Sequence, residues 1–385
     1  MKKEKHPNDK VLSQFSDNVV HIQSKLESVN ASLIIPKEQP WLWRGVIPLH
    51  TLTLFAGEGG IGKSQLLLDI AAKVSTGEIF QAGGQDHKLI KGKVLILTAE
   101  DDLEYTVSLK LLSSNADLTQ IEIVKTVTGD NRKRVLINLN TQIDLIKSKI
   151  NEMKNVKLII IDPILYFIGE INDNLNSEVA NFLNTLIEFA KDYDLAIIIN
   201  KHFRKKSSGK NVTSAADEVG GAGAWTNSPR LSWAITRYHD DPKLNIISNI
   251  KSNITEKTEE VLAYRIKSYI VIVSSETGES TSINTTQLVW HDKMVSITAN
   301  EAVNKETFDK SKKQIAADFI ISYLEENGQS IAKKVKEAAT VFRKDIKLRT
   351  FEDAIRDLKI NKTIKIEKGF GKNKVLSLMD CGIEN

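Results

Sequence analysis

Cysteine is almost absent from this chain, and no apolar run approaches the length of a membrane span. The 385 residues include a single cysteine, Cys381, so no disulfide can form within the chain, which suits a reducing compartment. A membrane-spanning helix needs roughly 20 apolar residues, and the basic start MKKEKHPNDK is not followed by the apolar segment of a signal peptide. We therefore expect a cytoplasmic protein without membrane contact.

A strong charge of one sign, internal repeats and low-complexity tracts are also missing. The net charge is +4, with 41% hydrophobic and 26% charged residues, which describes a soluble globular protein. A length of 385 residues exceeds one ordinary hydrophobic core, so we expect two or three folding units.

The stretch 57–64, read as GEGGIGKS, fits the phosphate-loop pattern G-x-x-x-x-G-K-[ST]. An apolar strand at 52–56 precedes it and a helical stripe at 66–71 follows it, which disfavours a chance glycine-rich turn. The glycines let backbone N–H groups face a phosphate, and the helix start adds its positive dipole end. The pattern predicts that Lys63 reaches the β- and γ-phosphates of a nucleoside triphosphate and that the Ser64 hydroxyl holds Mg²⁺. The predicted nucleotide-binding residues of this loop are Gly57, Glu58, Gly59, Gly60, Ile61, Gly62, Lys63 and Ser64.

Further apolar runs alternate with helical stripes. The runs are 94–97, 158–161, 195–199 and 231–235, and the stripes lie at 143–150 and 179–190. Continuous apolar runs are typical of buried parallel strands, and their alternation with helices predicts a mostly parallel α/β sheet with ligands at the carboxyl ends of its strands. After Arg237, the runs 245–250, 261–266 and 268–273 predict short antiparallel strands.

Acidic residues end two of these runs. Asp162 follows 158–161, and an apolar strand that closes on aspartate is the Walker B arrangement, in which the carboxylate holds the magnesium shell. Glu100 ends another strand within AEDD, 99–102, where a carboxylate could orient and activate the attacking water. The alternative for these three acids is a solvated helix start, with Asp101 and Asp102 in its first turn.

Asn200-Lys201-His202 ends the run 195–199. The dipeptide N-K at a strand end is similar to the guanine-reading motif N-K-x-D, but this chain has Phe203 where that motif needs an acid, so we predict ATP and not GTP. We interpret His202 as a sensor near the γ-phosphate; a histidine with purely structural contacts is the alternative. The basic loop that follows, 204–210, either contacts nucleic acid phosphates or is merely solvated.

The chain divides into four parts on this pattern. We interpret residues 1–40 as an N-terminal arm with a short edge strand at 33–35, 41–300 as the nucleotide-binding domain, 301–312 as a linker and 313–380 as a small C-terminal domain. In the last part, helices at 316–324, 335–342 and 351–358 and strands at 363–366 and 375–378 predict a winged helix-turn-helix. Residues 311–380 hold 16 Lys and Arg against 10 Asp and Glu, so the positive charge concentrates there, as expected of a DNA-binding domain. Protein contact is the alternative use.

In this order the motifs resemble those of the RecA/DnaB-type ATPases, and most of all the plasmid RepA-like hexameric helicases and their AAA-25 relatives. WLWRGVIP at 41–48, leading into GEGGIGKS, resembles the opening of that family. AEDD, IIIDP at 159–163, the segment with Asn172, and KHFRK at 201–205 follow in family order. The resemblance covers residues 41–270.

The resemblance implies a RecA-like core, six subunits and a central channel for single-stranded DNA. It implies that Glu100 is the catalytic base, that the strand of His202 lies between those of the phosphate loop and Asp162, and that Arg230 reaches a neighbour's γ-phosphate. Two departures concern such contacts. Family members often have paired histidines where this chain has Lys201-His202, and their basic pair K-x-R reads Lys251-Ser252-Asn253 here, so only Lys251 carries over.

We therefore expect an ATP-dependent, ring-forming DNA translocase or helicase that serves replication of a plasmid, phage or mobile element. The alternative is an ATP-gated assembly or regulatory protein that does not unwind DNA. A KaiC-like kinase is a third interpretation.

Overall fold

The computed structural model describes residues 28–124, 126–128, 134–204, 214–274, 280–342, 346–369 and 373–379. Two features named in the sequence analysis lie outside these residues: most of the basic loop after Arg204, and Cys381. The chain divides into two compact units, Met1–Glu38 and Gln39–Asn385.

The described part of the first unit contains one short 3-10 helix, η1 (Ala31–Leu33). Its N-cap is Asn30, whose side chain accepts a hydrogen bond from the backbone of Ser32. The following Ile34 is extended but belongs to no strand, so the predicted edge strand at 33–35 is wrong. A local cap satisfies the backbone here instead of a neighbouring strand.

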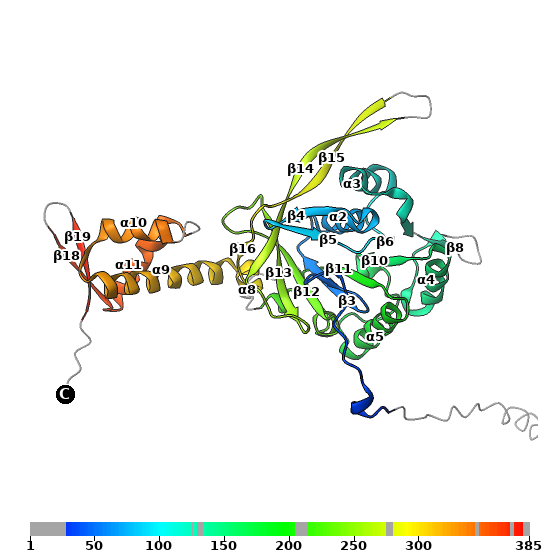
Figure 1. The fold of residues 1–385 in the computed structure, drawn as a ribbon, viewed down its shortest axis with the longest axis horizontal. Coiled ribbons are helices and arrows are strands. Elements are labelled where there is room, and N and C mark those ends of the chain that lie inside the picture. Colours follow the sequence, from blue (N-terminus) through cyan, green and yellow to red (C-terminus); the bar gives the residue numbers. More distant parts are fainter. Residues whose placement is uncertain are drawn as a thin grey trace, which may run out of the picture. The chain divides into compact units, whose positions relative to one another are not determined.

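The second unit contains a ten-stranded sheet with the order β15-β14-β13-β12-β3-β11-β10-β6-β7, and β16 lies beside β14 (Figure 1). The strands from β12 to β7 in this order run parallel, which confirms the predicted mostly parallel sheet. The bounds of all ten strands of the sheet are β3 (Leu52–Gly57), β6 (Lys93–Thr98), β7 (Ile121–Val124), β10 (Val156–Asp162), β11 (Ala196–His202), β12 (Leu231–Arg237), β13 (Asn245–Ser252), β14 (Glu260–Ser274), β15 (Ser280–Trp290) and β16 (Val295–Ser296).

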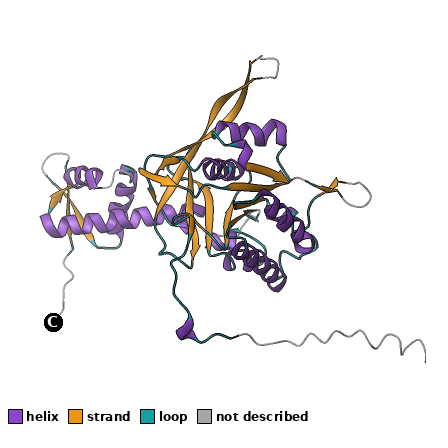
Figure 2. Cartoon of the chain, turned by 45° about the vertical axis from the view of Figure 1, so that its right-hand side comes forward, coloured by secondary structure: helices purple, strands orange, loops and turns teal. Residues whose placement is uncertain are grey.

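Helices cover both faces of this sheet (Figure 2). The helices α2 (Lys63–Thr76) and α3 (Ser108–Ser113) pack on the face that includes Phe55 and Ile160. The helices α4 (Leu139–Met153) and α5 (Asn176–Asp192) pack on the face that includes Leu54 and Ile159. Because successive strand residues point to opposite faces and both faces are buried, the strands read as continuous apolar runs.

Shorter elements connect these layers. They are the paired strands β1 (Trp41–Trp43) and β2 (Ile47–Pro48), β4 (Ile79–Ala82) and β5 (Gln85–Lys88), β8 (Val127–Thr128) and β9 (Arg134–Val135), the single turns η2 (Leu103–Val107), η3 (Leu118–Gln120) and η4 (Ile164–Tyr166), and the short helices α6 (Ala215–Glu218) and α7 (Ala224–Asn227).

The antiparallel part of the sheet differs from the prediction. The two short strands expected at 261–266 and 268–273 form one long strand, β14, which pairs with β15 along residues Tyr264 to Ser274. No strand was predicted at 280–290, where Ser, Thr and Asn are frequent, but these residues form β15. Threonine favours strands, and cross-strand pairing along β14 supplies the hydrogen bonds that the polar composition obscures.

Residues 301–312, predicted to be a linker, are mostly helical. Helix α8 (Ala299–Val303) begins with a capping box between Thr298 and Glu301, and α9 (Lys305–Asn327) begins two residues after it ends. The C-terminal elements that follow are β17 (Ser330–Ile331), α10 (Ala332–Phe342), α11 (Leu348–Ile360), β18 (Ile364–Lys368) and β19 (Lys374–Leu378). The three predicted helices and both predicted strands are present, and β17 adds an unpredicted strand beside β19. A separate hydrophobic core holds these elements together.

Candidate nucleotide-binding site

The phosphate loop turns between β3 and α2, at the carboxyl edge of the parallel strands. Gly60 and Gly62 have φ angles of +72° and +89°, which side chains with a Cβ rarely adopt. Gly57 is required for another reason, because a Cβ there would lie 2.4 Å from the carbonyl oxygen of Ile235 on β12. No described atom lies within 4 Å of a Cβ placed on Gly59 or Gly60, so this side of the loop borders open space.

Lys63, the first residue of α2, is buried and makes three hydrogen bonds. Its ammonium donates to Gly57 O at 2.9 Å, to Glu58 O at 2.7 Å and to His202 Nδ1 at 3.1 Å. An ammonium group has three donors, so all of them are used within the protein. A bound triphosphate would have to replace these acceptors.

The charge of Lys63 is weakened by its surroundings. Burial lowers the pKa of Lys63 to about 8, although the nearby carboxylates of Asp162, Glu100 and Glu58 act in the opposite direction. Desolvation disfavours an ammonium, and negative charge favours it. The phosphates of a bound nucleotide would therefore restore a full positive charge at this position.

His202 lies between Lys63 and Glu100. The Lys63 ammonium can only donate, so Nδ1 of His202 accepts and the proton of the neutral ring lies on Nε2. Nε2 is 3.6 Å from Oε1 of Glu100. The structure therefore brings together three predicted site residues that are far apart in the sequence.

The three consecutive acids have different surroundings. Asp101 forms an ion pair with Lys110 at 3.0 Å. Asp102 caps η2 by accepting hydrogen bonds from two backbone N–H groups at 2.8 and 2.9 Å. Glu100 faces His202, whose ring contacts Lys63.

Asp162 ends β10 and is buried. Nδ2 of Asn200, on the adjacent strand β11, donates a hydrogen bond to Oδ1 of Asp162. Asn200, considered above only for base specificity, therefore also contacts the aspartate predicted to hold magnesium, a contact that was not predicted. The sequence offered one signal for this contact, because a polar residue ends the run 195–199. The resemblance implied that this strand lies between those of the phosphate loop and Asp162, and β11 does lie between β3 and β10.

The residues at this edge fit a magnesium ion bound with a nucleotide. Mg²⁺ prefers oxygen ligands and keeps several waters, and the Ser64 hydroxyl and Asp162 carboxylate are such ligands. Oδ1 of Asn200 is buried and accepts no hydrogen bond among the described residues, so it is available to a metal-bound water. The described residues contain no cluster of three or more His, Cys, Asp or Glu that could hold a metal, so the phosphates would complete the coordination.

Lys201 is buried on the other side of this strand end and serves a different purpose from His202. Its ammonium lies 3.6 Å from Oδ2 of Asp173 and 5.2 Å from the ring centre of Trp225. Asp173 O in turn accepts from Trp225 Nε1 at 3.1 Å and from Ala222 N at 2.7 Å. Lys201 and Asp173 thus fasten the loop before α5 to the segment that leads to Arg230. Asp173 was not predicted to take part, because no short motif marks it.

Arg230 and Lys251 lie at the opposite edge of the sheet. Arg230 N donates to Leu52 O, where β3 begins, whereas Gly57 is level with Ile235. Five strand residues, about 17 Å, separate Arg230 from the level of the phosphate loop. The exposed guanidinium of Arg230 has no hydrogen bond or ion pair with a described residue, whereas Lys251 donates to the carbonyl oxygens of Asn227 and Pro229.

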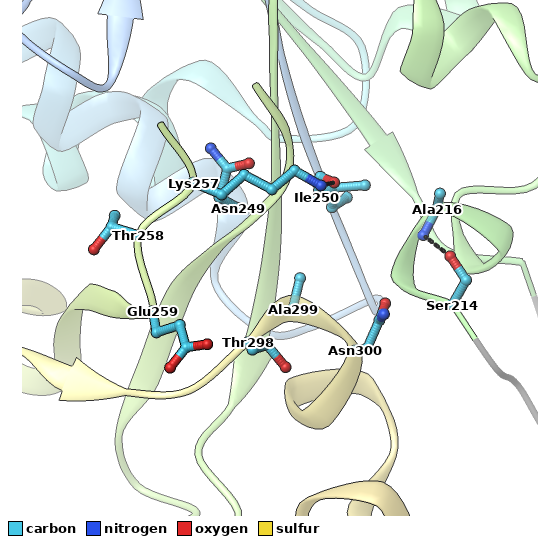
Figure 3. Close-up of a pocket in the computed structure, with 10 residues that line it drawn as sticks. All are labelled: Ser214, Ala216, Asn249, Ile250, Lys257, Thr258, Glu259, Thr298, Ala299 and Asn300. Carbon is cyan, nitrogen blue, oxygen red and sulfur yellow. Dashed lines mark hydrogen bonds between the residues drawn. The ribbon is translucent and has the colours of Figure 1, made fainter. Parts of the chain in front are cut away.

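A polar cavity of about 340 Å³ lies elsewhere, between α6, β13 and the start of α8 (Figure 3). Lys257 lines it, but its ammonium already donates to Ile250 O at 3.1 Å. None of the predicted site residues lines this cavity. The chemistry predicted from the sequence therefore concentrates at the phosphate loop.

Two comparisons with known proteins agree with this geometry. Residues 21–208 match the family model AAA_25, described as an AAA domain. Over 209 residues the chain is 29% identical to "DNA repair protein RAD57" of Saccharomyces cerevisiae (strain ATCC 204508 / S288c), in an alignment that covers 49% of this chain and 43% of that protein. The chain thus spans less than half the length of this relative.

The family match spans the phosphate loop, Glu100, Asp162 and His202, which the structure places at one edge of a mostly parallel sheet. Among the described residues, no helix is both long and apolar enough to cross a bilayer. The parallel sheet, the phosphate loop and the match over residues 21–208 together fit a P-loop ATPase domain with a RecA-like core.

Proposed function

We propose that this protein is an ATP-dependent, ring-forming DNA translocase or helicase. The observation that carries the proposal is the contact chain from Lys63 through His202 to Glu100. It links a phosphate-binding cation, a candidate sensor and a candidate base across separate strands. A site built only to bind a nucleotide needs no acid beside the sensor.

Each residue has a separate part in hydrolysis under this proposal. Lys63 leaves the carbonyl oxygens of its own loop and binds the β- and γ-phosphates, which breaks its hydrogen bond to Nδ1 of His202. The freed ring can then turn its Nε2–H toward the γ-phosphate. Glu100 orients and activates the attacking water, and Asn200 holds Asp162. Ser64 and Asp162 would hold Mg²⁺, which would supply charge neutralisation at the phosphate oxygens.

The position of Arg230 is the reason for proposing a ring of several copies. It lies too far from its own phosphate loop to act there, and its side chain is exposed. An arginine can supply a permanent charge and a planar fork to a neighbour's γ-phosphate. Because Lys251 is engaged with two backbone carbonyls that precede Arg230, we assign it to positioning this segment and Arg230 to the neighbour's site.

DNA is the proposed substrate for two reasons. The aligned relative is a DNA repair protein, and positive charge concentrates in the C-terminal residues. We interpret those elements as a winged helix-turn-helix with β18 and β19 as the wing. Lys368 and Lys374 lie directly opposite each other there, a destabilising pair of like charges that a nucleic acid phosphate would neutralise.

The deciding experiment measures ATP turnover with and without single-stranded DNA, with electron micrographs of the same sample. We expect DNA to stimulate turnover and the particles to be closed rings. ATP should be preferred to GTP, since Phe203 replaces the acid of the guanine motif. Turnover that DNA does not change, or equal use of GTP, would contradict the corresponding part of the proposal.

The second candidate is an ATP-gated assembly protein that acts on DNA without unwinding it. The similarity to a DNA repair protein favours it, because repair does not require strand separation by every participant. A strand-displacement assay separates the two. DNA-stimulated turnover and ring formation without displacement of a labelled strand would favour the assembly protein.

A further inference from the structure

The β14–β15 hairpin projects past the edge of the sheet that carries the phosphate loop (Figures 1 and 2). Tyr264 of β14 pairs with Asn245, the first residue of β13, at this edge. Beyond this point, residues 265–274 pair only with β15 among the described residues. We call residues 267–274 and 280–286 the outer ribbon.

The outer ribbon exposes apolar side chains. Ile270 and Ile272 are 56% and 69% exposed, and alternate residues of a strand point to the same face. Their cross-strand partners are Asn284 and Ser282, which leave the isoleucines uncovered. A two-stranded ribbon is at best marginally stable in water, so this face indicates a partner.

The charge of the outer ribbon indicates a protein partner. Lys267 is its single charged residue, and β15 contains neither charge nor proline over Ser280–Trp290. Edge strands are usually guarded by lysine, proline or a bulge against pairing with other chains. A nucleic acid surface would instead need several cations.

The hairpin contacts the phosphate loop and its helix through residues at its base and through Thr286, at the inner end of the outer ribbon. A Cβ on Gly62 would lie 2.1 Å from Cδ1 of Ile266, so Ile266 packs directly on the loop. Thr286 Oγ1 donates to Gln65 Oε1 at 2.9 Å. Trp290 Nε1 donates to Asp69 Oδ2 at 3.0 Å. Whatever binds the outer ribbon therefore acts next to the nucleotide.

We propose that the outer ribbon docks on a second copy of this chain in the nucleotide-bound assembly. The inference rests on the proposed function, in which Arg230 of one copy faces the phosphate loop of the next. The copy that supplies Arg230 must therefore lie at the carboxyl edge of the other copy's parallel strands, past which the outer ribbon of that other copy projects. The uncharged face of Ile270 and Ile272 then becomes part of the contact between copies, and Ile266 relays that contact to the phosphate loop.

The test compares assembly of the intact chain with that of the double variant Ile270→Asp/Ile272→Asp. Mass photometry across a concentration series, with Mg²⁺ and a non-hydrolysable ATP analogue, gives the concentration of half-assembly. We expect the double variant to raise it by more than about tenfold. Ile79→Asp is the matched control, because Ile79 is a 63% exposed strand isoleucine on β4, and it should assemble as the unmodified protein does.

Two further measurements keep the outcome decisive. Thermal melting and binding of a fluorescent nucleotide test whether the double variant is folded. A photo-cross-linking residue at position 272 should give chain–chain products with the ATP analogue, whereas the same residue at position 79 should not. Wild-type assembly of a folded double variant, or no such product from an assembled protein, overturns the inference alone. A protein that never assembles overturns both the inference and the proposed ring.

Discussion

At the scale of a single residue, a variant of Glu100 tests the proposed role of this carboxylate in ATP hydrolysis. Replacing it with glutamine removes the carboxylate that faces His202 but keeps the size of the side chain. We expect Glu100→Gln to bind ATP as the unmodified protein does and to lower turnover by more than about tenfold, because the amide cannot activate water. Steady-state phosphate release and nucleotide titration measure the two quantities.

Asp101→Asn is the matched control for this prediction. Asp101 pairs with Lys110 near the surface, and such a pair contributes at most about 1 kcal/mol. Turnover of Asp101→Asn should therefore remain close to that of the unmodified protein. Equal losses in both variants would remove Glu100 from the role of base.

Lys63 gives a prediction about protons. Because burial lowers the pKa of Lys63 to about 8, much of the nucleotide-free protein is neutral at this position at pH 8.5. The negative phosphates favour the ammonium and raise the pKa again, so binding must take up a proton. Calorimetric titration with ATP, without Mg²⁺, in buffers of different ionisation enthalpy should show net uptake at pH 8.5.

The uptake should decline as the pH falls well below the pKa of Lys63, where the free protein is already charged. His202→Gln is the control, because it removes the nearest other titratable ring and leaves Lys63 buried. Uptake that persists in His202→Gln assigns the proton to Lys63. No proton uptake at pH 8.5 by the unmodified protein would contradict the lowered pKa of Lys63 in the nucleotide-free protein.

At the scale of elements, the small sheet of β17, β18 and β19 carries the prediction about DNA. Lys365, Lys368 and Lys374 are exposed on β18 and β19. Replacing all three with alanine in the intact chain should weaken DNA binding and reduce the slope of log affinity against log salt by about 0.7–0.9 for each phosphate that the variant no longer neutralises. Fluorescence anisotropy over a salt series measures both.

Lys333 and Lys334 on α10 provide the control for that element, because they belong to the same module but not to its sheet. Alanine at these two positions should change DNA binding less than alanine at the three sheet positions. An unchanged salt slope in the sheet variant would assign the module to protein contact.

At the scale of the whole molecule, mixing experiments test completion of the site between copies. Arg230→Ala and Lys63→Ala proteins should each be inactive, because one lacks the trans-acting cation and the other the phosphate-binding cation. Mixed in one ring, they should regain part of the turnover, since an intact phosphate loop can then face an intact Arg230. Turnover and mass photometry of the same mixtures measure this.

Two outcomes would contradict this prediction. One is near-normal turnover of Arg230→Ala alone, and the other is no recovery in rings shown to be mixed. Lys251→Met cannot make the hydrogen bonds to Asn227 and Pro229 and should lose turnover. Because the segment that Lys251 positions acts on the neighbouring copy, mixing this variant with Lys63→Ala should restore part of the turnover. Lys251→Arg should restore part of its turnover.

Features that depend on neighbouring residues could be predicted from the chain before it folds. The phosphate loop is contiguous, and its glycines are needed where the backbone takes positive φ or has no room for a Cβ. The buried parallel strands were recognisable because both of their faces are apolar. The amphipathic C-terminal helices followed from their own periodicity.

Features that join distant segments became visible only in the folded molecule. His202 meets Lys63 across 139 positions, and Asp173 meets Lys201 without any local motif. The polar strand β15 could not be predicted, because its hydrogen-bond partners come from β14 and α3 and its own residues show no apolar alternation. The spacing of residues along the chain predicts the phosphate loop and the buried strands. Strand pairing instead depends on the free energy of contacts that form only when the sheet is assembled.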